Sequence, residues 1–308
     1  MDTNDRKVNS RTHSITMNRD SKFILRKIIM DFAILFCVGF LILSFYLWGT
    51  PYKRGFFCDD ESLKHPYRES TVTNLMLYIV GLCLPVVTMC LTEWIHLRDH
   101  KSGRPRELMG REIPTWVWEA YRVVGVFLFG CACQQLTTDI AKYTIGRLRP
   151  HFFDICRPNI NCTAPENKWR YIVDFECLRT DEPKLIKEMR LSFPSGHSSF
   201  SAYTMLYFSF YLHKRFTWRG SKLLRHAIQF VLIMLAWYTV MTRISDYKHH
   251  WSDVLAGFSI GLLVAVIVFT FVSNLRKTPR NRQPVSHHDS ELQTNGNGNT
   301  RSASSWRV

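Results

Sequence analysis

The chain has 308 residues, of which 46% are hydrophobic and 21% are charged, and its 40 Lys+Arg against 25 Asp+Glu give a net charge of +15. This apolar content excludes an intrinsically disordered protein. The mean hydropathy of −0.10 is close to that of a soluble protein, but the apolar residues gather in long windows that are almost free of charge. That segregation is typical of an integral membrane protein.

Six apolar windows follow one another along the chain. Four of them, over residues 28–48, 72–95, 116–136 and 254–272, hold about 20 residues each and can cross a bilayer as helices. The windows 199–212 and 226–241 are shorter, and could instead be helices buried within a bundle or re-entrant segments. We expect an all-α integral membrane protein with a bundle of six transmembrane helices.

The loops between these windows differ in charge on the two sides of the membrane. On one side 23 Lys+Arg and 8 Asp+Glu lie in segments 1–27, 96–115, 213–225 and 273–308. On the other side 16 Lys+Arg and 14 Asp+Glu lie in segments 49–71, 137–198 and 242–253. Because basic segments stay in the cytoplasm, both termini are predicted to be cytoplasmic. The basic loop 213–225 contains no acidic residue, which favours two short windows that both cross the membrane. Orientation in the membrane and attraction to anionic lipid also explain the excess of basic residues, so we do not expect nucleic-acid binding.

This topology divides the chain into three parts. A cytoplasmic N-terminal segment, 1–27, precedes a membrane domain, 28–272, and a tail, 273–308, whose composition predicts disorder. The absence of a terminal retention signal favours the plasma membrane over internal secretory membranes. The oligomeric state stays open, and a homo-oligomer is compatible with these features.

The outer loops carry two signs of an oxidising compartment. Asn161 begins the one N-x-S/T sequence of the chain, which predicts a glycosylation site. Four cysteines lack the spacing of a zinc site and predict one or two disulfides, with the pairing open; they are Cys58, Cys156, Cys162 and Cys177.

Two clusters in the outer loop 137–198 have the chemistry of phosphate binding. Just beyond the third window, Lys142, Arg147 and Arg149 form a cationic group, because a guanidinium fork and an ammonium both suit phosphate oxygens. Ser195-Gly196-His197 immediately precedes the fourth window, where the free N–H groups of a helix start can hold an anion.

A third cluster in loop 242–253 holds Arg243, His249, His250 and Asp253. If a helix starts here, His249 and Asp253 share a face, so that the carboxylate orients one ring nitrogen and leaves the other free to attack. His250 points about 100° away and is expected to be structural. The three clusters together predict phosphotransfer, with attack by His249 on a phosphomonoester and His197 as the acid and base.

The three motifs resemble those of a known family. Lys142 with six residues to Arg149-Pro150, then Pro194-Ser195-Gly196-His197, then Arg243 with five residues to His249 and three more to Asp253, resemble the type 2 phosphatidate phosphatase superfamily. The flanking residues 138–143 and 246–253 are similar to its animal lipid phosphate phosphatase branch. Ser usually opens the third motif, and Thr242 stands in its place in this chain. Because Thr retains the hydroxyl group, we expect the activity to be retuned rather than lost.

The resemblance implies an integral membrane enzyme that hydrolyses phosphatidate, lysophosphatidate, ceramide 1-phosphate or sphingosine 1-phosphate at the outer face. The reaction would pass through a phosphohistidine and use no metal or other cofactor. The implied roles are nucleophile for His249, acid and base for His197, partner of His249 for Asp253, and phosphate binding for Lys142, Arg149, Ser195, Gly196 and Arg243.

Two alternatives stay open. One is a non-catalytic relative that binds or transports lipid phosphates, against which the intact His197, His249 and Asp253 argue. The other is a polyprenyl-diphosphate or sugar phosphatase of the same fold, because these enzymes share the chemistry of the phosphate. The order of preference among the four lipid phosphates is not readable from the residues.

Overall fold

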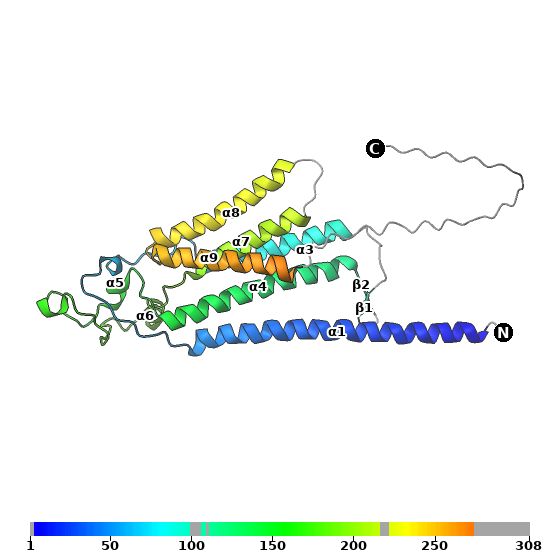
Figure 1. Cartoon of the computed structure of the whole chain (residues 1–308), viewed down its shortest axis with the longest axis horizontal. Coiled ribbons are helices and arrows are strands. Elements are labelled where there is room, and N and C mark those ends of the chain that lie inside the picture. The colour runs from blue at the N-terminus through cyan, green and yellow to red at the C-terminus, as the bar shows by residue number, and fades with distance from the viewer. Residues whose placement is uncertain (1–2, 99–105, 109–110, 216–221, 274–308) are drawn as a thin grey trace, which may run out of the picture. The chain divides into compact units, whose positions relative to one another are not determined.

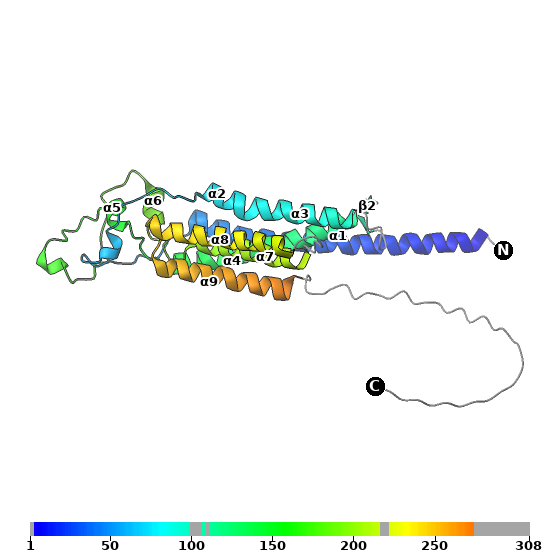
Figure 2. The same cartoon turned by 90° about the horizontal axis from the view of Figure 1, so that it is seen from above.

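The structure is a computed structural model that describes residues 3–98, 106–108, 111–215 and 222–273. Its long helices are α1 (Thr3–Trp48), α4 (Thr115–Ile145), α7 (Gly196–Arg215), α8 (Lys222–Ser245) and α9 (Trp251–Ile267), which η4 (Val268–Val272) continues as a π-helix. Another helical run joins α2 (Asn74–Tyr78), the π-helical η2 (Ile79–Cys83) and α3 (Leu84–Leu97). In both Figure 1 and Figure 2 the long helices lie side by side and nearly parallel.

The short elements lie in the connections. The strands β1 (Arg106–Leu108) and β2 (Arg111–Ile113) form an antiparallel pair in which Arg106 faces Ile113. The segments outside the long helices at the other end are η1 (Glu61–Leu63), α5 (Phe152–Cys156), η3 (Pro165–Asn167) and α6 (Pro183–Glu188). They fold the segments 49–71 and 146–195 into a cap over that end of the helices.

Five helices in the described part of the chain are long and apolar enough to cross a membrane. They are Ser21–Trp48, Asn74–Leu97, Thr115–Ile145, Leu223–Ser245 and Trp251–Val272. These spans contain or overlap five of the six predicted windows, so an all-α membrane protein is confirmed. The sixth window, 199–212, lies within α7, which is outside this set, and the count of six stays a prediction.

The polar helix α7 lies within the bundle and contacts α3, α4, α8 and α9. Most of its large side chains are buried, and two of its tyrosines bond to neighbouring helices: Tyr203 donates to the carbonyl of Phe127 at 2.9 Å, and Tyr211 to the Glu93 carboxylate at 3.0 Å. A helix whose polar groups find partners inside the protein need not be apolar on every side. This explains why the composition of window 199–212 resembles that of a soluble helix.

Glycines on α9 let it pack directly against α7. A Cβ atom at Gly257 would collide with the backbone carbonyl of Ser195, and one at Gly261 would collide with that of Ser199. Since the two glycines are four residues apart, they lie on one face of α9. The close approach fixes the start of α7 against α9.

The cap has its own core and two disulfides. Phe56 packs against Phe152 and Phe175, with ring centroids 5.0 Å apart in both pairs. The disulfides are Cys58–Cys162 and Cys156–Cys177, which confirms the prediction and settles the pairing. Except for Ser273, the predicted disordered tail lies outside the described residues.

Candidate active site

The three predicted clusters lie where helix ends meet. Lys142 is on the last turn of α4, Ser195 and His197 lie at the start of α7, and His249 lies in the short connection between α8 and α9. Because α7 contacts both α4 and α9, the clusters come together at one end of the bundle, near α5 and α6 (Figure 1). The sequence prediction that they form one site is consistent with this arrangement.

The end of α4 differs from the prediction, which placed Lys142 in a loop. The helix continues to Ile145 and is closed by Gly146, whose φ of +58° suits glycine and whose N–H donates to the carbonyl of Lys142 at 3.1 Å. The apolar window ends earlier than the helix, because the last turns carry polar side chains that face the protein. Gly146 then turns the chain so that Arg147 and Arg149 follow in the cap.

His249 has the geometry of a nucleophile. Its ring is 5% exposed, and Nδ1 lies 2.7 Å from the carbonyl oxygen of Ser192. Since a carbonyl only accepts, Nδ1 carries the proton and Nε2 holds a free lone pair. Burial, followed by the charges of Arg149 and Lys142, lowers the pKa of His249 well below its usual value. The imidazole is therefore neutral at neutral pH.

The predicted hydrogen bond between Asp253 and His249 is wrong. The helix α9 begins at Trp251 rather than at His249, so the two residues do not share one helical face. The Asp253 carboxylate instead accepts from Ser192 Oγ at 2.5 Å, Arg147 Nη1 at 2.5 Å and the His250 N–H at 3.2 Å. Asp253 thus holds Ser192, whose own carbonyl orients His249. His250 lies 3.1 Å from the Leu148 carbonyl through Nε2, and its structural role stays a prediction.

The start of α7 is fixed by backbone and hydroxyl contacts. Ser195 is fully buried, donates its N–H to the carbonyl of Asp253 at 2.9 Å, and shares a hydroxyl contact of 3.0 Å with Ser198. At Gly196 a Cβ atom would lie 3.0 Å from Lys142 Nζ, so the glycine lets this ammonium approach the helix start. The His197 ring hydrogen-bonds to the backbone of Val72.

Arg243 is held in place by a buried network. Its guanidinium is 1% exposed and donates through Nη2 to Asp246 at 3.1 Å and to the Thr242 hydroxyl at 3.2 Å. Asp246 also accepts from the N–H and the hydroxyl of Thr71, both at 2.8 Å. Thr242 therefore supports the arginine through the hydroxyl that it shares with serine.

Three site nitrogens are buried without a hydrogen-bond partner. Among the described residues eight buried side-chain atoms are unpartnered, and three of them are Arg149 Nε, His197 Nε2 and Arg243 Nε. Buried polar groups are nearly always bonded, so an unpartnered set needs an explanation. Electrostatic interactions of His197 with Arg243, Lys142 and Arg149 place these groups near one another. An anion among them would satisfy the free nitrogens.

Sequence reasoning missed the supporting roles of three residues. It counted Arg147 among the phosphate-type cations, but the guanidinium pairs with Asp253 and also donates to Ser252 at 2.8 Å. Ser192 and Asp246 were not among the predicted site residues. Only the proximity of Ser192 to Pro194-Ser195-Gly196-His197, and of Asp246 to Arg243, could have drawn attention to them.

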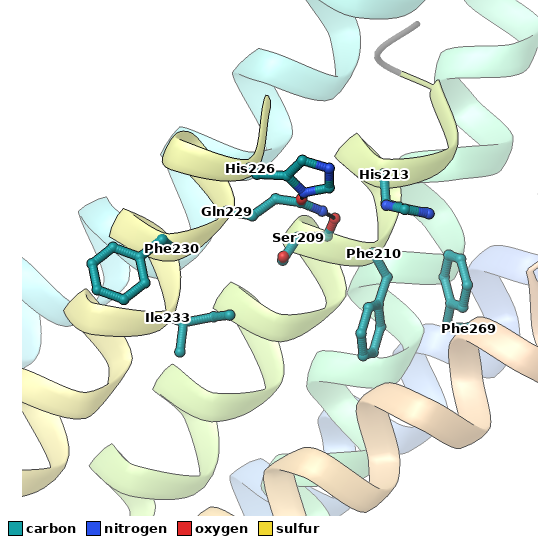
Figure 3. A pocket seen from close by; sticks show the side chains of 8 residues that line it. All are labelled: Ser209, Phe210, His213, His226, Gln229, Phe230, Ile233 and Phe269. Carbon is teal, nitrogen blue, oxygen red and sulfur yellow. Dashed lines mark hydrogen bonds between the residues drawn. The ribbon is translucent and has the colours of Figure 1, made fainter. Parts of the chain in front are cut away.

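The larger of two cavities lined by described residues does not lie at the three clusters. A hollow of about 500 Å³ is bounded mainly by α7 and α8, with Phe210, His213, His226 and Phe269 among its lining residues (Figure 3). It lies along the second half of α7, away from His197 at its start, and holds none of the predicted site residues. A smaller hollow of about 190 Å³ lies beside Arg147 and His250, next to the histidine site. The predicted site residues therefore lie at the helix ends and not around the larger cavity.

The fold and the site define an integral membrane protein with a cationic, histidine-containing site at one end of a helical bundle. Residues 123–277 match the model of the family described as the PAP2 superfamily, and this match contains all three clusters. The chain therefore belongs to the PAP2 superfamily.

Several curated proteins are similar to the chain. It is 49% identical to a Drosophila melanogaster protein named "Putative phosphatidate phosphatase", over 87% of this chain and 74% of that protein. It is 38% identical to phospholipid phosphatase 1 of Rattus norvegicus, over 84% and 90% of the two chains, and 40% identical to phospholipid phosphatase 2 of Homo sapiens, over 75% and 77%. No solved structure gives a significant match.

Proposed function

We propose that the protein is a lipid phosphate phosphatase that hydrolyses phosphomonoesters through a phosphohistidine, without a metal ion. The curated relatives are named as phosphatases of phosphatidate and of phospholipids. The substrate class follows as phosphatidate, lysophosphatidate, ceramide 1-phosphate and sphingosine 1-phosphate. Each has a phosphate monoester on a membrane-anchored body, which suits a site at helix ends near the headgroup layer.

The unpartnered nitrogens of Arg149, His197 and Arg243 are the observation that carries this proposal. A phosphate offers the acceptor oxygens that these groups lack, and Lys142 beside Gly196 adds a further positive charge. Fixed cations aimed at the equatorial oxygens stabilise the charge of the transition state. The cationic site can therefore supply the electrostatic stabilisation that a metal supplies elsewhere.

The proposed reaction has two steps. The lone pair of His249 Nε2 attacks phosphorus, the ester P–O bond breaks, and the departing oxygen takes a proton from His197. His197 then removes a proton from water, whose oxygen attacks phosphorus and breaks the P–N bond. Inorganic phosphate leaves and His249 is restored. Bound phosphate offsets the charges of Arg149 and Arg243, which lets His197 hold the proton that the first step uses.

The proposal includes the predicted topology. The six spans, the cytoplasmic termini and an outer or lumenal site agree with two disulfides in the segments that carry the site. Asn161 is exposed and accepts from the Thr163 hydroxyl at 2.6 Å, so its side chain lies at the surface of the same cap. The plasma membrane is the proposed location.

The test is phosphate release from phosphatidate in detergent micelles by the purified protein, with excess EDTA. We expect release to survive EDTA, to be abolished in His249→Ala, and to persist in the control His213→Ala, whose histidine lines the larger cavity. Brief turnover with a phosphorus-labelled substrate should trap an acid-labile label on the intact protein and none on His249→Ala. Full activity of His249→Ala would overturn the mechanism, and no release from any lipid monoester would favour a binding role.

A further inference from the structure

Lys248 is a buried cation next to the site that the three motifs leave unexplained. It precedes His249, is 5% exposed, and donates its backbone N–H to the carbonyl of Arg243 at 3.1 Å. Its ammonium lies over the ring of Tyr67, 3.7 Å from the centroid. An ammonium is expensive to bury, so its position needs a compensating role.

The charges around Lys248 do not neutralise it. Arg149 and Arg243 repel the ammonium, and Glu188 and Asp246 attract it. Asp246 is bonded to Arg243 and Thr71, and Glu188 is exposed. Within the described part of the chain, the Lys248 ammonium makes no ion pair within 4.0 Å. The face of an aromatic ring replaces only part of the lost hydration.

The backbone just before Lys248 has an unusual conformation that its neighbours hold in place. Tyr247, the preceding residue, has a φ of +53°, a conformation that a bulky side chain rarely adopts. The turn is supported from both sides, because His65 stacks on the Tyr247 ring at 4.3 Å and His151 Nδ1 lies 2.9 Å from the Tyr247 carbonyl. Such strain persists where the surrounding structure holds it, commonly at a functional site.

Tyr67 is fixed as a platform for this ammonium. Its N–H donates to the Asp154 carboxylate at 2.8 Å, and its ring meets His151 edge-on at a centroid distance of 5.2 Å. The ring is half-buried, and it interacts electrostatically with Arg149. Lys248 and Tyr67 therefore lie together near Arg149, one of the arginines that we propose to bind phosphate.

We propose that Lys248 is a specificity-determining substrate residue, a fourth cation that binds the incoming phosphate and makes the site prefer a dianionic monoester over a singly charged diester. Tyr67 holds the ammonium in the empty site and orients it toward the phosphate. This inference rests on the proposed function, and it concerns which phosphate is bound rather than which atom attacks.

The steady-state test compares Lys248→Gln and Lys248→Arg with the control Lys64→Gln, whose lysine pairs with Glu61 on the cap surface. A hydrogen bond to a charged phosphate justifies an expected rise in KM for phosphatidate of about tenfold to a hundredfold in Lys248→Gln, with a smaller change in kcat. Lys248→Arg should retain most of the affinity. A phosphodiester competitor should have the same inhibition constant for the wild type and for Lys248→Gln.

The pH dependence of kcat/KM distinguishes phosphate binding by Lys248 from a purely structural role, which would leave this dependence unchanged. Burial and then Arg149 lower the pKa of Lys248 to about 8. The ammonium is charged below that pH, so kcat/KM of the wild type should fall as pH rises through about 8. In Lys248→Arg this fall should move to higher pH, since arginine stays charged, and in Lys248→Gln it should disappear. Tyr67→Ala should raise KM, whereas Tyr67→Phe, which keeps the ring, should not.

Calorimetric titration with inorganic phosphate tests the proposal without turnover. Weaker phosphate binding by Lys248→Gln, with an unchanged unfolding temperature, would support the role of Lys248 even in a protein that hydrolysed nothing. The proposal would be overturned if Lys248→Gln left three properties unchanged: KM, the fall of kcat/KM above about pH 8, and phosphate binding. This conclusion would hold even if the wild type were an active phosphatase.

Discussion

At the scale of single residues, the position of His249, the proposed nucleophile, depends on a chain of contacts. Asp253 is completely buried, holds the Ser192 hydroxyl, and reaches His249 only through the Ser192 carbonyl. Arg147 compensates the charge of the buried carboxylate. The acid therefore acts on the backbone that presents the acceptor to His249, and its effect on the imidazole is positional.

This chain of contacts predicts that Ser192 and Asp253 act as one unit. Ser192→Ala and Asp253→Asn should each lower kcat, and the double variant should lose less than the sum, with a coupling energy of about 1 kcal/mol or more. The measurement is a double-mutant cycle on kcat for phosphatidate hydrolysis. Ser201→Ala, a buried serine on α7, should combine additively with Asp253→Asn. Additive losses for Ser192 and Asp253 would contradict the indirect connection.

At the scale of elements, the direct packing of α9 on α7 sets the position of the start of α7, where we propose that phosphate binds. In Gly257→Ala the new methyl group would meet the Ser195 carbonyl, which cannot move without displacing the helix start. Overpacking of this kind costs about 1–3 kcal/mol. We therefore expect lower activity and a lower unfolding temperature.

Gly125→Ala is the matched control, because an added Cβ at this α4 glycine would meet nothing within 4 Å. Alanine is also the better helix former, so this variant should be at least as stable as the wild type. Phosphate release and thermal unfolding in the same detergent compare the two. Equal activity of the Gly257 and Gly125 variants would show that the α7 start does not depend on the close contact.

The cap should lose stability in acid. Burial lowers the pKa of His151 to about 4, whereas an unfolded histidine titrates near 6.5. Between these values the unfolded chain binds a proton that the folded cap excludes, so stability falls as pH drops, by up to about 3 kcal/mol. The lowered pKa of His249 acts in the same direction. Thermal unfolding between pH 7 and pH 5 measures the loss.

His151→Gln should weaken this acid dependence, because it removes one of the groups that must stay neutral. His226→Gln, which changes an exposed histidine of α8, should leave it unchanged. An identical pH dependence of unfolding in the wild type and in His151→Gln would contradict the conclusion that His151 contributes to the loss of stability in acid.

The elements also show how far the sequence could predict the protein. Long apolar windows marked five helices, because lipid-facing residues carry most of that signal. The sequence predicted the helix ends less well. The last turns of α4 carry polar side chains that face the site, and α9 begins at Trp251, two residues after His249. The residue types of the three motifs indicated the chemistry. The partner of His249 is a backbone carbonyl, which has no residue type to detect.

At the scale of the whole molecule, the proposed topology is open to a direct test. With the cap outside the cytoplasm, Asn161 should carry a glycan when the protein is made in animal cells. Glycosidase treatment should then increase the electrophoretic mobility of the wild type and leave that of Asn161→Gln unchanged. Asn167→Gln, a cap asparagine outside any N-x-S/T sequence, is the control. A cytoplasmic cap would show no glycan in any of these variants.

The Cys58–Cys162 disulfide makes two distant parts of the chain inseparable. Its partners are 104 residues apart in sequence, and the region between them includes α2, α3 and α4. A single protease cut anywhere inside that stretch would leave α1 covalently attached to α7, α8 and α9. Such a nicked protein should run as one band on a non-reducing gel and as two after reduction. An enzyme of this kind can thus be clipped without shedding its first helix.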